Sequence, residues 1–101
     1  MRPLHWAILD KRRPVLVLTR ELMVGRMSTV TVAPVTSKIH GIATELPVGV
    51  QNGLDQPSAV KCDQIMSIPI QQLHEPCGFL LDAQAEELAL HEAIQAAFDL
   101  V

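Results

Sequence analysis

The chain has 101 residues, of which 49% are hydrophobic, and its 8 Lys and Arg against 11 Asp and Glu give a net charge of −3 at pH 7. This length fits a single domain, 1–101, with a small core, and the negative balance argues against a general nucleic-acid binder. No apolar run approaches the roughly 20 residues that span a bilayer, and the start has no signal-peptide pattern, so we expect no membrane association.

Two cysteines, Cys62 and Cys77, are too few for a disulfide framework, and their spacing matches no zinc motif. We therefore expect both to be buried thiols in a reducing cytoplasm. The high apolar content predicts that part of the surface is covered by a partner, most simply a second copy of the chain.

The charges are distributed unevenly. Seven of the eight Lys and Arg lie at or before position 38, namely Arg2, Lys11, Arg12, Arg13, Arg20, Arg26 and Lys38, and beyond it Lys61 is the only basic residue. Two interpretations remain open. In the first, the basic and acidic parts neutralise each other in the fold; in the second, the basic third concentrates an anionic ligand on one face.

The first part of the chain predicts two strands and a loop. In 3–9, Leu4, Trp6 and Ile8 alternate with other residues, which indicates a short strand. A charged turn, 10–14, follows, in which Pro14 biases Arg13 toward an extended backbone. The apolar run 14–18 is typical of a central strand that is buried on both faces, and 20–28 reads as a loop with one helical turn at 21–23.

The stretch 30–48 predicts a hairpin. Its first strand, 30–36, is rich in β-branched residues and contains Pro34, which predicts an edge or a bulge there. A polar turn, 37–41, leads to a second strand, 44–48. The end of this hairpin gathers groups suited to phosphate: Thr36, Ser37, Lys38 and His40.

The remainder predicts turns at 49–57, strands at 58–62 and 65–69, a helical turn at 70–73, a short last strand at 77–80, and a helix from Asp82. In that helix Glu86 and Glu87 suit the helix dipole, and the apolar stripe is Ala85, Leu88, Ala89, Ile94, Ala97 and Phe98. Several short strands and one C-terminal helix predict a mainly β fold with α structure (α+β), a small barrel-like domain.

No histidine pair, Ser-His-Asp set, glycine-rich phosphate loop or carboxylate cluster is evident, so we expect neither a metal nor another cofactor. The order of the remaining motifs is more informative. The segments RRPVLVL, VTVAPVTSKIHGIATELP and LDQPSAVKCDQIMSIP, followed by a helix, resemble the MazF/PemK family of toxin ribonucleases from bacterial toxin–antitoxin pairs, over nearly the whole chain.

The resemblance implies an SH3-like β-barrel with a C-terminal helix, a homodimer in the bacterial cytoplasm, and a cognate MazE-like antitoxin. It implies sequence-specific, metal-independent cleavage of single-stranded RNA (mRNA, tRNA or rRNA), with Arg13 and Thr36 as the catalytic pair. The candidate RNA-binding residues beside them are Lys11, Arg12, Ser37, Lys38 and Gln64. The chain departs from the family in its opening strand and in the loop before Arg13, which is cut to three residues, Asp10 to Arg12.

The residues suit this chemistry. Attack of a 2′-hydroxyl on its own phosphate gathers negative charge on the non-bridging oxygens, to which a guanidinium presents a planar fork of donors and a threonine hydroxyl adds another. Histidine is the side chain best suited to proton transfer near neutral pH, which makes His40 a candidate, but the family pattern does not require it. The alternatives are a non-catalytic toxin that poisons DNA gyrase, since fold alone does not decide activity, and an inert interaction domain.

Overall fold

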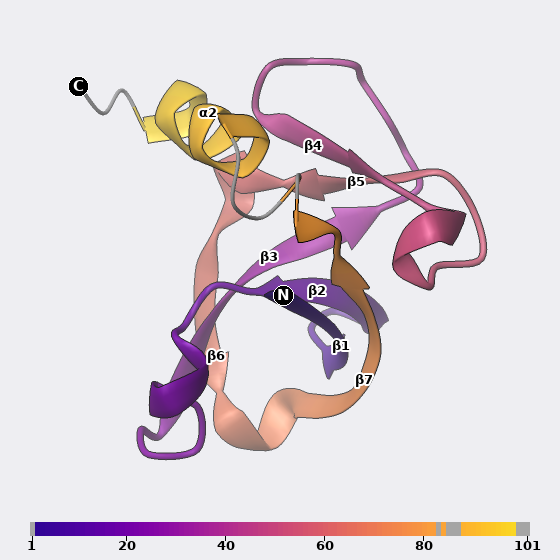
Figure 1. Ribbon diagram of the computed structural model, residues 1–101. Helices are drawn as coiled ribbons and strands as arrows, with labels where there is room; N and C mark the ends of the chain where they lie inside the picture. Colours follow the sequence, from indigo (N-terminus) through magenta and orange to yellow (C-terminus); the bar gives the residue numbers. More distant parts are fainter. Residues whose placement is uncertain (1, 83, 85–87, 99–101) are drawn as a thin grey trace.

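The computed structural model describes residues 2–82, 84 and 88–98. Within these residues, seven strands form one antiparallel sheet in the order β4-β5-β3-β2-β1-β7, and β6 also pairs with β3. The sheet curls strongly, so that β7 bends around toward β6, and α2 covers one end (Figure 1). The predicted fold class, mainly β with a C-terminal helix, is confirmed.

The two N-terminal strands form a hairpin, β1 (Arg2–Ile8) with β2 (Arg12–Val17). In β1 the buried side chains are Leu4 and Ala7, whereas Ile8 is exposed and Trp6 is half-buried, so the predicted alternating face is wrong. The reason is that the pairing of β1 with β7 shifts register on either side of His5, and each irregularity changes which side chains face inward.

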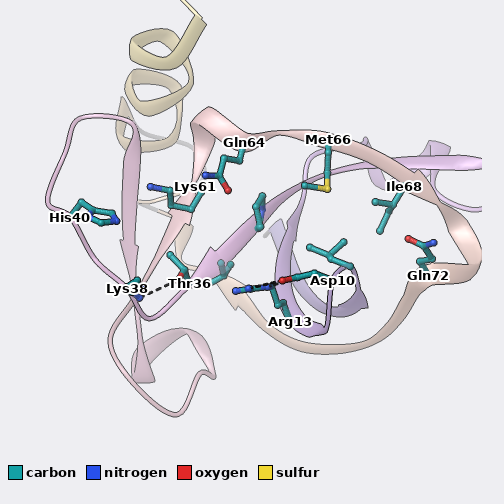
Figure 2. Close-up of a pocket in the computed structure, with 13 residues that line it drawn as sticks. Asp10, Arg13, Thr36, Lys38, His40, Lys61, Gln64, Met66, Ile68 and Gln72 are labelled. Carbon is teal, nitrogen blue, oxygen red and sulfur yellow. Dashed lines mark hydrogen bonds and ion pairs between the residues drawn. The ribbon is translucent and has the colours of Figure 1, made fainter.

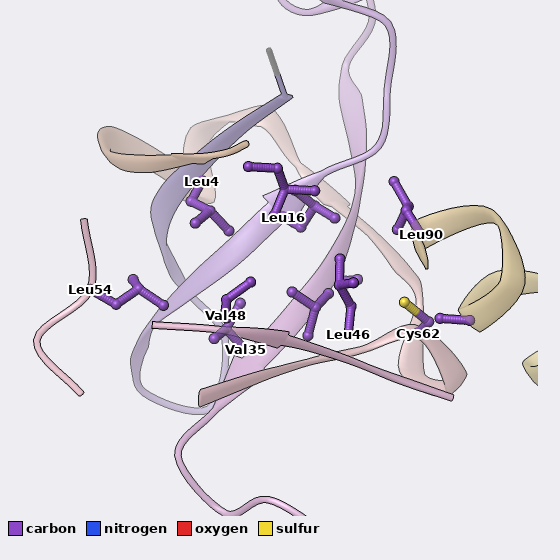
Figure 3. Close-up of a cluster of buried hydrophobic side chains, with 12 residues drawn as sticks. Leu4, Leu16, Val35, Leu46, Val48, Leu54, Cys62 and Leu90 are labelled. Atoms are coloured by element: carbon purple, nitrogen blue, oxygen red, sulfur yellow. The ribbon is translucent and has the colours of Figure 1, made fainter. Parts of the chain in front are cut away.

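The prediction that the second strand is apolar on both faces is confirmed. Leu16 belongs to a helix-side core, whereas Val15 and Val17 belong to a β6-side core on the other face of the sheet. The helix-side core comprises Leu4, Leu16, Ala33, Val35, Leu46, Val48, Leu54, Val60, Cys62, Leu80, Leu90 and Ala93 (Figure 3). The β6-side core comprises Ala7, Val15, Val17, Val30, Val32 and Ile68.

The predicted hairpin over 30–48 is wrong in its pairing. β3 (Thr29–Thr36) and β4 (Glu45–Val48) do form, but β5 (Ser58–Lys61) lies between them and pairs with both. The connection 37–44 is therefore a crossing loop rather than a tight turn. The hydrophobic pattern identifies a strand well, but it does not determine which of several similar strands pairs with it.

Pro34 lies in a central strand rather than at a sheet edge. On one side β3 pairs with β2 from Val32 to Pro34, and on the other side it pairs with β6 up to Val32 and with β5 from Val35 onward. Pro34 thus falls where β3 changes partners, a position at which a missing N–H interrupts no continuous ladder.

The later elements are short. The 3-10 turns η1 (Glu21–Met23) and η4 (Ile70–Gln72) match the two predicted helical turns. Between and beyond them come η2 (Val50–Asn52), η3 (Cys62–Gln64), β6 (Met66–Pro69) and β7 (Leu73–Leu80). β7 is longer than predicted because its bulged pairing with β1 accommodates Glu75 and Pro76, which the sequence pattern alone does not favour in a strand.

Helix α2 (Leu88–Phe98) packs against η3 and β4. Its buried residues are Leu90 and Ala93, whereas Ala89 and Phe98 are exposed, so the predicted stripe is rotated around the helix. The predicted helix start with Ala85, Glu86 and Glu87 lies outside the described residues. No helix in the described part is long and apolar enough to cross a membrane.

The thiols differ in environment. Cys62 is fully buried, and burial raises its pKa to about 11. Cys77 is only partly buried, although burial raises its pKa as well. The prediction of a buried thiol is thus confirmed for Cys62 and corrected for Cys77, because β7 passes along the rim of a pocket.

Candidate active site

Arg13 stands at the start of β2, where the charged turn delivers it beside Asp10. The Asp10 carboxylate accepts the Arg13 Nε–H at 2.9 Å and an Nη2–H at 3.1 Å. This pairing with Arg13 lowers the pKa of Asp10 to about 2 and raises the pKa of Arg13. Asp10 thereby fixes one edge of the guanidinium, and the Nη1 group and the second Nη2–H remain on the other edge.

Thr36 is the last residue of β3, at the point where the sheet ends. Its hydroxyl oxygen accepts the Lys38 N–H at 3.1 Å. Because the oxygen already accepts from Lys38, the hydroxyl proton points away from that N–H and can be donated to another group. Figure 2 shows Thr36 and the paired Arg13 on neighbouring strands, facing the same hollow.

This hollow is a pocket of about 610 Å³ between the ends of β2 and β3, η3 and β6. Of the sequence-predicted residues, Arg13, Thr36, Lys38 and Gln64 line it. The other lining residues are Leu9, Asp10, Pro34, Val35, His40, Lys61, Met66, Ile68 and Gln72. We call this candidate site the catalytic pocket.

A second pocket, of about 590 Å³, adjoins the first and shares Arg13, Thr36 and Lys38 with it. Lys11, Arg12 and Ser37 line this one, together with Trp6 and the turn 53–56. The structure therefore brings all seven predicted site residues to the walls of two pockets that meet at Arg13 and Thr36. We call the second one the flanking pocket.

Arg12 is exposed, but its side chain has two contacts within the chain. Its guanidinium lies 4.9 Å from the centre of the Trp6 ring and forms an ion pair with Glu75. The half-buried Trp6 and the partly exposed ion pair leave Arg12 on the rim of the flanking pocket. Part of its charge is thus already matched within the chain.

The buried Lys61, which lines the catalytic pocket, and its buried partner Glu45 were not predicted as site residues. The side chains of Glu45 and Lys61 are 2% and 10% exposed and form an ion pair of 3.0 Å, and Glu45 also accepts the N–H groups of His40 and Gly41. Burial by itself raises the pKa of Glu45, but these hydrogen bonds outweigh it and hold the pKa below its usual range. The only pointer in the sequence was the isolated position of Lys61 among acids.

The comparison with protein families decides the assignment. The family described as PemK-like, MazF-like toxin of type II toxin–antitoxin system matches residues 7–98. The chain belongs to this toxin family. That agrees with the resemblance seen in the three sequence segments, which lie inside or overlap the matched range.

Relatives of this MazF-like toxin are close in sequence and in structure. Endoribonuclease MazF3 of Mycobacterium tuberculosis is 54% identical over 100 residues, covering 99% of this chain and 95% of the relative. A probable endoribonuclease, MazF5, of the same organism is 35% identical over 91 residues, covering 87% of this chain and 80% of the relative. The solved structure of M. tuberculosis toxin MazF-mt6 has a TM-score of 0.94 and 52% identity, covering 99% of both chains.

A more distant structure shows the fold alone. An endoribonuclease from a mycobacterial species, solved in complex with its cognate antitoxin, has a TM-score of 0.82 at 18% identity and covers 98% of this chain and 93% of its own. The likeness extends over almost the whole described sheet.

The site of this MazF-like toxin carries a specific set of chemical groups. One guanidinium is oriented by a carboxylate, one hydroxyl is oriented by a backbone N–H, and Lys38, Lys61 and His40 line the same pocket. Among the described residues, no group of three or more His, Cys, Asp and Glu is arranged to hold a metal ion. Such a pocket favours a phosphate that gains negative charge.

Proposed function

We propose that this toxin is a sequence-specific, metal-independent endoribonuclease that cleaves single-stranded RNA, leaves 2′,3′-cyclic phosphate and 5′-hydroxyl ends, and so inhibits translation and growth. The observation that carries the proposal is the meeting of Arg13 and Thr36 between two adjoining pockets, in a chain 54% identical to a named endoribonuclease. An RNA strand would follow the two pockets, with the scissile phosphate at their junction.

In this mechanism Arg13 and Thr36 are the catalytic residues. The edge of Arg13 that Asp10 leaves available donates to the non-bridging oxygens, where charge accumulates as the 2′-hydroxyl attacks. The Thr36 hydroxyl donates to the same group. Arginine is a poor free base because its pKa lies far above neutral pH, so we assign Arg13 to charge stabilisation. His40 lines the same pocket, and we assign it to contact with the RNA rather than to the chemical step.

The RNA contacts flank this centre. Lys38 and Gln64 would bind the strand in the catalytic pocket, and Lys11, Arg12 and Ser37 in the flanking pocket. Phosphate contacts by such cations supply affinity that weakens with salt. The shortened loop before Arg13 leaves Asp10 directly against the guanidinium, three residues away in sequence.

The proposal includes a homodimer in the bacterial cytoplasm and inhibition by a MazE-like antitoxin. Large apolar side chains remain exposed, among them Leu22, Val50 and Phe98, with exposed fractions of 80%, 69% and 47%. Surface of this kind is what a second copy or an antitoxin would cover. The gyrase-poisoning alternative is unsupported, since both curated relatives described above are named endoribonucleases.

The test is incubation of the purified protein with a long single-stranded RNA in EDTA, followed by analysis of the fragment ends. Cleavage at a short recurring sequence, giving 5′-hydroxyl and 2′,3′-cyclic phosphate ends, is the expected result. Intact RNA, or cleavage that needs a divalent ion, contradicts the proposal. Sequencing of 5′-hydroxyl ends from expressing cells then identifies the target RNA.

A further inference from the structure

The loop 37–44 forms one wall of the catalytic pocket, and it is held chiefly from one side chain. It carries Lys38 and His40, which line the pocket. Its middle is fixed by Glu45, whose Oε1 accepts the His40 N–H at 3.0 Å and the Gly41 N–H at 2.8 Å. Figure 2 shows the loop reaching out from β3 past Lys38 and His40 before it returns as β4.

Two consecutive N–H groups pointing at one carboxylate require a particular backbone. Gly41 provides it with a φ of +69°, which a residue with a side chain adopts only at a cost. The region around this glycine is open, since a Cβ there would meet no atom within 4 Å. The backbone conformation rather than packing therefore explains the glycine, and the conformation serves the bond to Glu45.

Glu45 keeps its charge in a buried place because Lys61 faces it. The two side chains are among the few buried charged groups of the described chain, and Lys61 also lies 3.9 Å from Asp63. Replacing a buried ion pair by apolar residues is often neutral or stabilising. Stability therefore does not explain why a charged pair occupies this position. Its location behind the wall of the catalytic pocket suggests a role in the site.

We infer that Glu45 is a positioning residue for RNA binding: held by Lys61, its carboxylate clamps the 37–44 loop so that Lys38 and His40 stay on the wall of the catalytic pocket. This rests on the proposed function. Arg13 is fixed by Asp10, and the backbone of Thr36 is fixed by its place in β3. The loop reaches the Thr36 hydroxyl through the Lys38 N–H, which lies ahead of the Glu45 contacts at His40 and Gly41. Loosening the loop thus adds an ordering cost to RNA binding and changes the chemical step little.

The experiment is a double-mutant cycle with Glu45→Gln and Lys61→Met, assayed on a short RNA that contains the cleavage sequence. In Glu45→Gln the amide must place a donor against either the Lys61 ammonium or the loop N–H groups. We expect KM to rise about tenfold, a typical coupling for residues in one network, with kcat within about threefold. In the double variant the amide oxygen can return to the loop, so KM should recover part of the loss.

Three controls separate positioning from general damage. Val30→Ala truncates the β6-side core, where Val30 is 1% exposed, and it should lower Tm without raising KM. Gly41→Ala disturbs the loop backbone without touching the Glu45–Lys61 pair. It should raise KM, and the double variant with Glu45→Gln should show less than the sum of the two separate effects. Amide exchange of 38–43 should accelerate in Glu45→Gln, whether or not RNA is cleaved.

The outcomes are distinct. Independent, additive effects of Glu45→Gln and Lys61→Met would show that Lys61 contacts RNA by itself, and would overturn the clamp. An unchanged KM and unchanged loop exchange in Glu45→Gln would overturn it as well. Wild-type protein that leaves the RNA intact contradicts the proposed function, and the loop exchange then still tests the clamp.

Discussion

Arg13 offers the proposed substrate one edge of its guanidinium because Asp10 occupies the other. This arrangement makes the side chain rigid at the place where a phosphate would arrive, and orientation of this kind is a large part of what a catalytic site contributes. It also explains why a three-residue turn suffices before Arg13: a longer loop is not needed to orient the arginine when a carboxylate three residues earlier does so.

We expect Arg13→Ala and Thr36→Val each to lower kcat by about 10²–10³, since each removes one donor to the charged phosphate. Arg13→Lys should be nearly as poor, because a point charge does not replace the planar fork. Both residues end strands and contribute little to the cores, so Tm should stay close to that of the wild type. Wild-type turnover by Arg13→Ala in single-turnover RNA cleavage would remove the central assignment.

The Asp10–Arg13 pair also predicts a titration. The pKa of Asp10 should be about 2 in the native protein, compared with 3.8 in the unfolded chain, and it should return toward 3.8 in Arg13→Ala. A depressed native pKa contributes stability above pH 3.8 that is lost as the pH falls toward 2. Carbon-detected NMR titration of the carboxyl measures this directly; a wild-type value near 3.8 would mean that the pair does not form in solution.

At this scale the sequence predicts residues that neighbour a recognisable motif, and misses those whose role depends on tertiary contacts. Arg13 precedes a proline and an apolar strand, and Thr36 ends a β-branched one; these local features carry the resemblance to the toxin family, and the resemblance implies that the two form a catalytic pair. Glu45 and Lys61 are 16 positions apart in sequence, and the isolated position of Lys61 among acids does not indicate its partner. They become a pair only because β4 and β5 lie side by side, with Glu45 opposite Lys61.

Among the elements, the sheet depends on one close approach between η2 and β7. A Cβ at Gly78 would lie 1.9 Å from the Asn52 carbonyl oxygen. Asn52 itself is fully buried, and its side chain accepts the Gly49 N–H and donates to the Phe79 carbonyl. Glycine at 78 is thus required for β7 to pack under η2.

We expect Gly78→Ala to destabilise the protein by about 1–3 kcal/mol, the usual range for overpacking, which corresponds to a clear fall in Tm for a domain of this size. Gly25→Ala is the comparison. Its Cβ would meet no atom within 4 Å, and only its φ of +85° opposes a side chain. Thermal unfolding of both variants is the measurement, and a smaller loss for Gly78→Ala than for Gly25→Ala would contradict this packing.

The strands themselves were predictable because β-branched runs, prolines and turn residues mark their limits. The pairing partners of each strand were not predictable. The order β4-β5-β3 places a later strand between two earlier ones, and nothing in the local pattern of 30–48 distinguishes this from a hairpin. The buried face of α2 was likewise misplaced, since a helix of many alanines and leucines offers several apolar stripes and the sheet selects one.

For the molecule as a whole, the cations on the pocket walls predict how inhibition works. A flexible antitoxin segment with acidic and apolar residues should lie over Lys11, Arg13 and Lys38 and exclude RNA by occupancy and by charge. Arg12 should contribute less, because Glu75 already pairs with it.

Competition tests this prediction. When a short uncleavable RNA is titrated into the toxin–antitoxin complex, the antitoxin should be released, and inhibition should weaken at high salt without vanishing because apolar contacts remain. Ternary complexes in which RNA and antitoxin bind without mutual loss of affinity would show that the two do not share the pockets.

The change of pairing partners along β3 predicts how fast the backbone amides of β3 and of the loop after it exchange with deuterium. β3 is bonded to β2 on one side and to β6 and then β5 on the other, so its amides should exchange with deuterium only in global unfolding, as the slowest in the chain. The loop immediately after it should exchange on a much faster timescale. Thr36 is the last residue of β3, so its hydroxyl, proposed above as a donor to the phosphate, lies at the boundary between the slowest-exchanging strand and a fast-exchanging loop.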